Sequence, residues 1–452
     1  MIIPFDKNLI DLAKKLPTHL YAVGGVVRNF LIDGSMSKDI DLAAAISIED
    51  IKPILFDCGF KVVAEYKRTG TIVFTDGNTR AEFTTFRKER YSGGSHVPIE
   101  TEFTSDIVED ALRRDFKCNA VYYDIKDEKI VDVLGGVEDI KARILDTVTD
   151  PDKVFSSDGL RLMRLARFAG ELNFKPTAEV LNAASVHAVN IKDISPERIY
   201  AELNMILQSD GKYLFSDSSG HYTGLKILDV TRVLDIIIPE LADGRGMAQR
   251  ADFHRYDVLE HSLRSVLYAD KKVRLAALLH DVGKPYCFKR DGYYYHHFSE
   301  GEKIAERILK RFKADNATIK KVMFLVREHM IDLDCSVKES KVRKFLVKNY
   351  EHLEELLMVK QADFRASLEV EYTAPTLVKW KKILHDMQND GTPFTLKELN
   401  ITANELIDIG FVADGIGKEL KSLMDYAVLN PKNNVNEVLK KKAISDLKKY
   451  IT

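Results

Sequence analysis

Two aspartates separated by one residue, Asp39 and Asp41, have the spacing to hold metal ions together. In a β-strand, both carboxylates would lie on one face, with Ile40 on the opposite face. The two negatively charged carboxylates repel each other unless cations neutralise them. Their oxygens are suitable ligands for Mg²⁺ that bridges a triphosphate and an attacking hydroxyl group. Glu82, in a strand-like segment further along, is a candidate third ligand. We predict Asp39 and Asp41 as the catalytic pair, although an isolated Asp-x-Asp is more often a turn or a cap.

A pair of glycines precedes the aspartates, in the segment Val23-Gly24-Gly25-Val26-Val27-Arg28. The pattern predicts a strand that runs into a glycine turn and then a helix, where backbone N–H groups can approach phosphate. Arg28 would add a charged group to this phosphate site. A Gly-Gly pair alone is usually only a turn. The order of strand, glycines, arginine and Asp-x-Asp resembles the signature of the nucleotidyltransferase superfamily that includes DNA polymerase β-like enzymes.

The elements that must position these residues divide the chain into a mixed part and a helical part. Short β-like runs alternate with helical or turn segments from about residue 17 to 135, at 20–23, 40–43, 71–74, 82–86 and 120–123. After about residue 150 the strand signals nearly vanish, and apolar residues recur at helical spacing, as in Leu160, Met163, Leu165 and Phe168. A polar stretch at 388–393 predicts a linker, and Thr395 with Glu398 predicts a capping box for the helix after it.

Two longer motifs make the resemblance specific. The segments 113–120 (RRDFKCNA) and 158–168 (DGLRLMRLARF) match the pattern of class II tRNA nucleotidyltransferases and bacterial poly(A) polymerases. Shorter matches follow in the family's order, at 134–139, 194–199, 404–407, 410 and 415–417. The resemblance implies an α+β fold in four parts. Residues 1–148 would form a polymerase-β-like head with a mixed sheet, and residues 149–240 a helical neck with the base-selection helix. Residues 241–387 would form an HD-type helical body, and residues 388–452 a tRNA-binding tail.

The family resemblance also implies an activity. Such enzymes add C, C and A to the 3′ end of tRNA from CTP and ATP, without a nucleic-acid template and with Mg²⁺ in the head. The partners implied are the tRNA acceptor arm and 3′ end, ATP and CTP. The matching positions imply a nucleotide-binding set made of Gly24, Gly25, Arg28, Arg114, Asp115, Asn119, Asp158, Arg161, Arg164 and Arg167.

Base choice is assigned to Asp158 and Arg161, which the spacing places on one face of a helix. Cytosine and adenine both present an amine donor beside a ring-nitrogen acceptor, which complements a carboxylate beside a guanidinium. Uracil and guanine present the opposite order, so each wrong base would lose about 1–3 kcal/mol by analogy with bidentate base readout. For an arbitrary helix, the same spacing would more often be a surface ion pair.

The chain departs from the family pattern at two positions. Asn29 stands where the family usually has Asp, and Ser157 stands where it usually has Glu, which puts in doubt how Arg161 is held. The segment 88–109, with Gly93 and Gly94, has full length. In this family that loop is implied to be needed for the switch from C to A addition, which argues against an enzyme that adds only C.

A second group of metal-binding residue types lies in the helical part. His261, His280, Asp281 and Asp363 have the spacing of HD-domain phosphohydrolases, and His297 and His329 add two candidate ligands. Imidazoles and carboxylates around a divalent ion would activate water for phosphoester hydrolysis. The resemblance therefore implies a possible second divalent metal, in the HD domain. The alternative is an HD fold that serves only as a scaffold between neck and tail.

Composition sets broad limits on these expectations. The chain has 452 residues, of which 45% are apolar, enough for more than one core. No apolar run of roughly 18 residues occurs, and the charged N-terminus is unlike a signal peptide, so we expect a cytoplasmic protein with no membrane partner. The net charge of −2 neither supports nor excludes RNA, and the oligomeric state is left open. Lysines at 440–442 and 448–449 would meet RNA or form a solvated helix face.

Three alternative functions remain at this point. A poly(A) polymerase, or an enzyme that adds only CC or only A, shares the head motifs. An HD-domain metal-dependent phosphohydrolase with an inactive head belongs to another class. A non-catalytic RNA-binding protein is the third, and the intact carboxylates argue against it.

Overall fold

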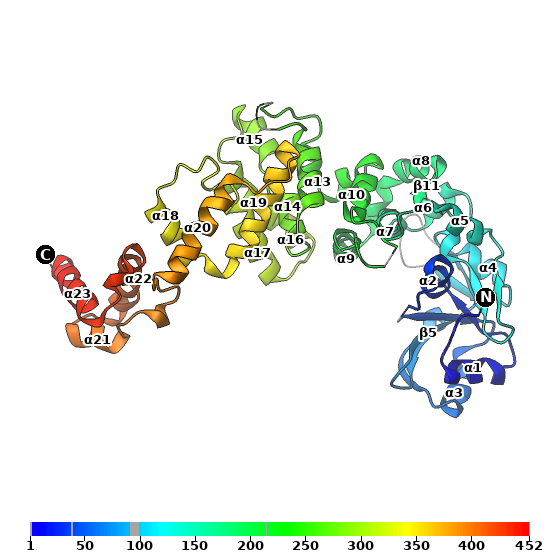
Figure 1. Ribbon diagram of the computed structural model, residues 1–452. Coiled ribbons are helices and arrows are strands. Elements are labelled where there is room, and N and C mark those ends of the chain that lie inside the picture. The colour runs from blue at the N-terminus through cyan, green and yellow to red at the C-terminus, as the bar shows by residue number, and fades with distance from the viewer. Residues whose placement is uncertain are drawn as a thin grey trace. The chain divides into compact units, whose positions relative to one another are not determined.

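The computed structural model describes residues 2–37, 39–90, 99–213, 215–250, 252 and 254–451 (Figure 1). It divides into two compact units. The first comprises Met1–Arg245 with Arg307–Asp315, and the second comprises Gly246–Glu306 with Asn316–Thr452. Among the described residues, no helix has the length and apolar character needed to cross a membrane.

A seven-stranded sheet forms the centre of the N-terminal part, in the order β3-β4-β5-β2-β1-β8-β9. The pairing of β2 with β5 is parallel, and the other pairings are antiparallel, so the predicted mixed sheet is confirmed. Five of these strands coincide with the runs predicted from the sequence, and β3 and β9 were not predicted. The bounds are β1 Tyr21–Val23, β2 Ile40–Ala44, β3 Lys61–Tyr66, β4 Thr71–Thr75, β5 Arg80–Thr85, β8 Tyr122–Asp124 and β9 Lys129–Val131.

Alternating side chains divide the central strands into a buried and an open face. Along β2 and β5, Leu42 and Phe83 are fully buried, whereas Asp41 and Glu82 are exposed. This is the pattern of a sheet that packs on a core with one face and leaves the other available. The helices around the sheet are α1 Lys7–Lys15, α2 Gly25–Asp33, α3 Ile48–Asp57, α4 Ile107–Leu112 and α5 Gly136–Ala142.

A two-stranded ribbon lies beside the main sheet and includes part of the predicted flexible loop. Strand β6, Arg87–Arg90, pairs antiparallel with β7, Glu100–Phe103. The glycines expected to matter for this loop, Gly93 and Gly94, lie outside the described residues.

The remainder is helical, as predicted, apart from the two-residue pair β10 Ile144–Leu145 and β11 Lys175–Pro176. Helices α7 (Leu160–Leu172) and α10 (Gly220–Val230) pack so closely that a Cβ on Gly170 would lie only 2.4 Å from the Gly220 carbonyl oxygen, so glycine is needed there. Up to residue 242 the helices are α6 Pro151–Ser157, α7 Leu160–Leu172, α8 Ala178–Val186, α9 Pro196–Leu207, α10 Gly220–Val230, α11 Leu234–Ile237 and α12 Pro239–Ala242. From residue 258 they are α13 Val258–Tyr268, α14 Arg274–Leu279, α15 Lys284–Asp291, α16 His297–Arg311, α17 Asn316–Glu328, α18 Glu339–Lys348, α19 Leu353–Leu368, α20 Pro375–Asn389, α21 Ala403–Ile409, α22 Ala413–Leu429 and α23 Asn436–Ile451.

The capping box predicted at Thr395 is wrong. Residues Leu396–Glu398 form only a 3₁₀ turn, and the Glu398 carboxylate accepts from the Phe394 N–H at 2.7 Å. The capping box lies at Thr402 and Glu405, which exchange side-chain and backbone hydrogen bonds at the start of α21. The same residue types occur at the same spacing in both places, so only the position of the following helix distinguishes them.

Candidate active site

Strand register brings two of the predicted metal ligands side by side. Asp41 of β2 lies directly opposite Glu82 of β5, and on its other side opposite Val23 of β1. Asp39 precedes β2 by one residue and is exposed. Asp41 and Glu82 therefore lie side by side on two central strands of the sheet, and Asp39 lies just before the first of them. Among the described residues, however, Asp39, Asp41 and Glu82 do not form a group with all ligand atoms within 4.8 Å, as residues in the second unit do.

The environment of Asp41 disfavours its charged form. Although the side chain reaches solvent, desolvation by the surrounding protein raises its pKa to about 6; the charges of Glu82 and Asp39 add to this effect, and Arg114 opposes it. Carboxylates that repel one another in this way are stabilised by a divalent cation. The arrangement is therefore chemically suited to Mg²⁺.

Gly24 forms the turn between β1 and α2, next to Asp41. Its φ of +76° and ψ of −136° lie in a region that residues with a Cβ rarely adopt, and a Cβ would stand 3.1 Å from Asp41 Oδ2. The absence of a side chain leaves this carboxylate oxygen accessible. Gly25 is the first residue of α2, whose first N–H groups lack helical partners and point out of the helix end.

We expect Gly24→Ala to weaken triphosphate use as well as stability. Backbone strain should lower the free energy of unfolding by about 1–3 kcal/mol, and the methyl group would crowd Asp41. Steady-state KM for CTP and thermal unfolding would measure the two effects. Gly77→Ala is the matched control, because Gly77 also has a positive φ, of +98°, but has open space around its Cβ position. An equal rise of KM in both variants would contradict a role for Gly24 at the site.

Four of the predicted nucleotide-binding residues form one hydrogen-bonded chain across α2, η2 (Lys117–Asn119) and α7. Arg28 Nη1 donates to Asn119 Oδ1 at 2.5 Å, and Asn119 Nδ2 donates to Asp115 Oδ1 at 3.1 Å. Arg164 Nε then donates to the other oxygen of Asp115 at 2.7 Å. Burial alone would raise the pKa of Asp115, but Arg164 and Asn119 hold it well below its usual range. The chain thus fixes two guanidinium groups beside a charged carboxylate.

The first departure from the family pattern has a structural role. Asn29 Oδ1 accepts from Arg28 Nε at 3.1 Å and from Nη2 at 2.9 Å. An amide oxygen therefore receives the two N–H groups of Arg28 that a carboxylate would receive, without its charge. Arg28 also lies over the ring of Phe168, with 5.3 Å to the centroid.

Asp158 lies at the bend between α6 and α7, whereas Arg161 lies in the first turn of α7, so the prediction that they share a helix face is wrong. Asp158 has extended backbone angles after α6, and its carboxylate accepts from the Leu160 N–H at 2.9 Å at the start of α7. The competing local bond from an aspartate to the backbone explains why the helix is interrupted there. Asp158 and Arg161 are only 4% and 7% exposed.

The second departure, Ser157, contributes to holding Arg161. The guanidinium donates from Nη1 to Ser157 Oγ at 3.3 Å and from Nη2 to the Arg113 carbonyl at 2.6 Å. A hydroxyl and a carbonyl therefore fix Arg161 where the family has a carboxylate.

The remaining two predicted arginines are paired with acidic residues. Arg114 donates to Asp110 at 3.0 Å and to the Tyr122 hydroxyl at 3.2 Å. Arg167 donates from Nε to Glu202 at 2.7 Å and from Nη1 to Glu171 at 3.3 Å, and all three of these side chains are buried. The pairing of Arg167 connects α7 with α9 inside the first unit.

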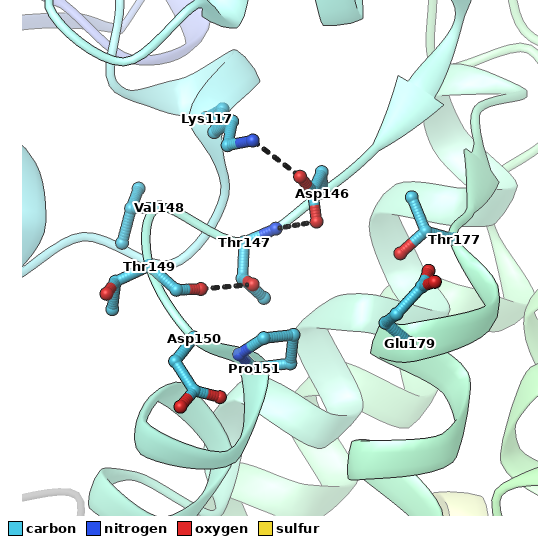
Figure 2. Close-up of a pocket in the computed structure, with 9 residues that line it drawn as sticks. All are labelled: Lys117, Asp146, Thr147, Val148, Thr149, Asp150, Pro151, Thr177 and Glu179. Carbon is cyan, nitrogen blue, oxygen red and sulfur yellow. Dashed lines mark hydrogen bonds and ion pairs between the residues drawn. The ribbon is translucent and has the colours of Figure 1, made fainter.

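A separate cavity of about 480 Å³ lies between the segment 146–151 and the start of α8 (Figure 2). Lys117 and Asp146 form an ion pair of 2.5 Å at its wall, and Thr177 and Glu179 of the α8 region line the other side. None of the residues predicted for metal or nucleotide binding lines it.

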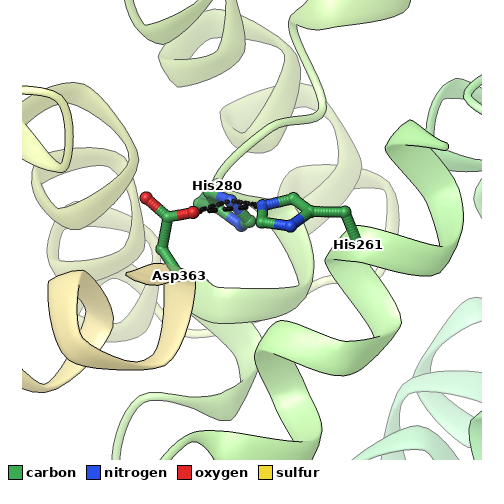
Figure 3. Close-up of side chains that lie close together, drawn as sticks. All are labelled: His261, His280 and Asp363. Carbon is green, nitrogen blue, oxygen red and sulfur yellow. Dashed lines mark hydrogen bonds and ion pairs between the residues drawn. The ribbon is translucent and has the colours of Figure 1, made fainter. Parts of the chain in front are cut away.

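The second predicted metal site is compact. His261 of α13, His280 after α14 and Asp363 of α19 converge, as Figure 3 shows, and one ligand atom from each lies within 4.8 Å of the others. His261 Nε2 lies 3.1 Å from Asp363 Oδ1 and 3.4 Å from Asp281 Oδ2. Against the effect of burial, the histidines hold the pKa of both aspartates well below its usual range. Sequence reasoning therefore identified a real cluster of four side chains.

Comparison with known families assigns three segments of the chain. The model of the poly A polymerase head domain matches residues 20–146. The model described as the probable RNA and SrmB-binding site of polymerase A matches residues 173–244, and the HD domain model matches residues 254–366. The three matches follow the order expected from the sequence motifs.

Individual relatives agree with this assignment. The A-adding tRNA nucleotidyltransferase of Deinococcus radiodurans is 30% identical over 362 residues, which cover 76% of this chain and 76% of that protein. The CCA-adding enzyme of Staphylococcus epidermidis is 34% identical over 190 residues, 42% of this chain and 46% of that enzyme. The Bacillus stearothermophilus CCA-adding enzyme in complex with CTP has the same fold, with a TM-score of 0.68 at 20% identity and 99% of both chains covered. The chain therefore belongs to the tRNA nucleotidyltransferase and poly(A) polymerase family of nucleotidyltransferases.

Proposed function

We propose that this protein adds C, C and A to the 3′ end of tRNA, using CTP and ATP, in the cytoplasm and without a nucleic-acid template. The observation that carries the proposal is the register of Asp41 with Glu82 beside the Gly24 turn, in the same unit as Asp158 and Arg161. Relatives named CCA-adding enzymes and a structural neighbour that binds CTP support the choice of substrates. We assign the head to 1–148, the neck to 149–240, the body to 241–387 and the tail to 388–452.

Asp39 and Asp41 hold Mg²⁺ in this proposal, and Glu82 supports them. Mg²⁺ would assist deprotonation of the tRNA 3′-hydroxyl and neutralise charge on the triphosphate. The hydroxyl oxygen bonds to the α-phosphorus, and the bond from that phosphorus to the pyrophosphate oxygen breaks. The N–H groups at the start of α2 face the triphosphate, and Arg28 and Arg164 supply positive charge.

Base choice rests on Asp158 and Arg161. The Asp158 carboxylate accepts from the exocyclic amine of cytosine or adenine, and the Arg161 guanidinium donates to the neighbouring ring nitrogen. Contacts to tRNA are expected mainly with phosphates and with the shape of the acceptor arm, because one enzyme must serve every tRNA. Binding should therefore weaken as salt rises.

Product sequencing with defined tRNA ends tests the main proposal. A tRNA that lacks its end should gain two C residues with CTP alone, and a tRNA ending in CC should gain one A with ATP alone. Long A tracts without C addition would replace the proposal with a poly(A) polymerase. Addition of A to the CC end, with no C addition to any end, would favour an A-adding enzyme, the activity named for the Deinococcus radiodurans relative.

Replacement of Asp158 by Ala is expected to relax base choice. Loss of the amine contact should reduce the preference for CTP over UTP by about 1–3 kcal/mol, roughly 5- to 150-fold in the ratio of kcat/KM values. Asp152→Ala is the control, because Asp152 is an exposed carboxylate of the neighbouring helix α6. If the Asp158 variant kept the CTP:UTP ratio of the parent protein, base choice would lie elsewhere.

We also propose that His261, His280, Asp281 and Asp363 bind a divalent ion and hydrolyse phosphoesters. The observation that favours this second function is the convergence of buried imidazoles and carboxylates at 3.1–3.6 Å. Hydrolysis of bis(p-nitrophenyl) phosphate and p-nitrophenyl phosphate, assayed with Mn²⁺, tests it. Activity should disappear in His280→Ala and persist in the variant Asp39→Asn/Asp41→Asn. Absence of hydrolysis in metal-loaded protein would leave the HD fold as a scaffold.

A further inference from the structure

Arg28 is a buried cation whose hydrogen-bond acceptors are all neutral. The residue lies in the first unit and is only 2% exposed. Its Nε and Nη2 donate to Asn29 Oδ1 at 3.1 and 2.9 Å, and its Nη1 donates to Asn119 Oδ1 at 2.5 Å. Nη2 also lies 3.4 Å from the Tyr213 hydroxyl oxygen. Within the described part of the chain, Arg28 therefore donates to two amides and a phenol, and to no carboxylate.

Two neighbouring arginines, by contrast, are paired with acidic side chains. The guanidinium carbons of Arg28, Arg164 and Arg167 lie 5.3, 5.1 and 4.3 Å from the centroid of the Phe168 ring. Arg164 and Arg167 form ion pairs of 2.6–3.3 Å with buried carboxylates. Of the three positive charges around this ring, that of Arg28 is the one without a direct counter-charge.

This arrangement is unfavourable in the free protein. Amide and hydroxyl oxygens replace the hydrogen bonds that water would make with a guanidinium, but they supply no full negative charge. The Phe168 ring offsets only part of the deficit through its π electrons. Nη2 lies 3.7 Å from the position that a Cβ on Gly25 would take, so the guanidinium lies against the first residue of α2. An anion bound there would compensate the charge.

Tyr213 brings a group from the neck to the same guanidinium. It lies in the segment between α9 and α10, and its ring centroid is 5.9 Å from the guanidinium carbon of Arg28. The ring stacks on Phe215, with 5.0 Å between centroids. A hydroxyl that accepts from Arg28 keeps its own hydrogen, which a phosphate oxygen can accept. Tyr213 can therefore contact the same anion as Arg28.

We propose that Asn29 keeps the charge of Arg28 uncompensated, so that a polyphosphate, either the triphosphate of the substrate or the pyrophosphate product, supplies the counter-charge. Asn29 is a positioning residue in this proposal, because it orients the guanidinium through two hydrogen bonds without neutralising it. The Tyr213 hydroxyl is a further donor to the bound polyphosphate. The proposal deepens the nucleotide addition proposed above and rests on it only for the identity of the natural ligand.

Asn29→Asp tests the proposal, because it keeps the shape of the side chain and adds the missing negative charge. Inorganic tripolyphosphate is titrated into the full chain with Mg²⁺ and without tRNA, and the heat of binding is measured. We expect the Kd to rise about tenfold, the effect of weakening one charge-assisted contact. The control is Asn78→Asp, which adds the same charge at an exposed turn of the same unit and should keep the parent Kd. An unchanged Kd in Asn29→Asp would overturn the proposal.

Thermal unfolding without ligand gives a second readout. A buried cation that gains a carboxylate becomes more stable, so Asn29→Asp should raise the unfolding midpoint of the first unit by about 2–4 °C. A lower midpoint, or a variant that fails to fold, would contradict the uncompensated charge of Arg28. Tyr213→Phe keeps the ring and removes only the hydroxyl, and it should raise the Kd for tripolyphosphate about threefold. An unchanged value would remove Tyr213 from the site.

Steady-state addition of CMP to tRNA separates this role from a general structural one. Asn29→Asp should raise KM for CTP about tenfold and leave kcat within about twofold, because the contact to the polyphosphate exists before and during the reaction. A fall in kcat at an unchanged KM would contradict it. Weaker tripolyphosphate binding in a protein that adds no nucleotide would sink the proposed function but leave the polyphosphate site intact. Nucleotide addition with an unchanged KM in Asn29→Asp would do the reverse.

Discussion

Asp41→Asn is expected to lower kcat/KM for nucleotide addition about a thousandfold. An amide carries no charge for the ion, and loss of several kcal/mol of charge stabilisation at the reacting phosphate corresponds to a loss of this size. The amide has nearly the same shape as the carboxylate, and Asp41 is exposed next to Glu82, so the fold should persist. Single-turnover addition of CMP to tRNA at saturating Mg²⁺ would measure the effect.

The appropriate control for Asp41→Asn is Glu49→Gln. Glu49 is an exposed carboxylate in the first turn of α3, in the same unit. Its replacement removes one negative charge from the surface and leaves Asp41 and Glu82 unchanged, so nucleotide addition should continue at the rate of the parent protein. If Asp41→Asn kept more than about a tenth of the parent activity, the assignment of this carboxylate to the ion would have to be abandoned.

Arg167→Ala should produce the largest loss of stability, about 3–5 kcal/mol in the free energy of unfolding of the first unit. Removal of one partner of a buried ion pair leaves an uncompensated charge in the interior. Glu171 keeps Lys212, whose Nζ lies 2.8 Å away, whereas Glu202 of α9 would lose the guanidinium that it contacts at 2.7 Å and keep only the more distant charge of Arg164. Urea unfolding followed by the fluorescence of a probe attached to the first unit would measure the change.

Arg198→Ala separates this effect from general changes to α9, because Arg198 is an exposed arginine of that helix. It should change the free energy of unfolding by less than about 0.5 kcal/mol. Arg167→Ala with equally small destabilisation but a raised KM for ATP would indicate that the arginine contacts the triphosphate, as the family resemblance implied.

Short β-like runs predicted β1, β2, β4, β5 and β8, in each of which at least half of the positions are buried. Strand β3, Lys61–Tyr66, has intermediate and exposed positions along its whole length, so its alternation was weak. Only pairing with β4 makes it a strand. The pair β10 and β11 has two residues in each strand, too few for any periodic pattern.

Motifs in the sequence propose candidate site residues, but they do not predict how these residues are arranged. The motifs identified Asp158 and Arg161, but not the interruption of the helix at Asp158, which depends on one side-chain bond to the Leu160 N–H. The motifs also gave no sign that Arg161 donates to the carbonyl oxygen of Arg113, a residue 48 positions earlier in the chain. Long-range contacts of this kind leave no local pattern in the chain.

The pairing of Asp41 with Glu82 restricts how the chain can change in length. Side chains alternate along β5, so deletion of one residue within it would turn Glu82 into the core and bring an apolar neighbour beside Asp41. The turn before β5 is closed by Asp76, whose carboxylate accepts from the N–H groups of Asn78 and Thr79. Insertions in this family should therefore accumulate in that turn and be absent from the strand that follows it.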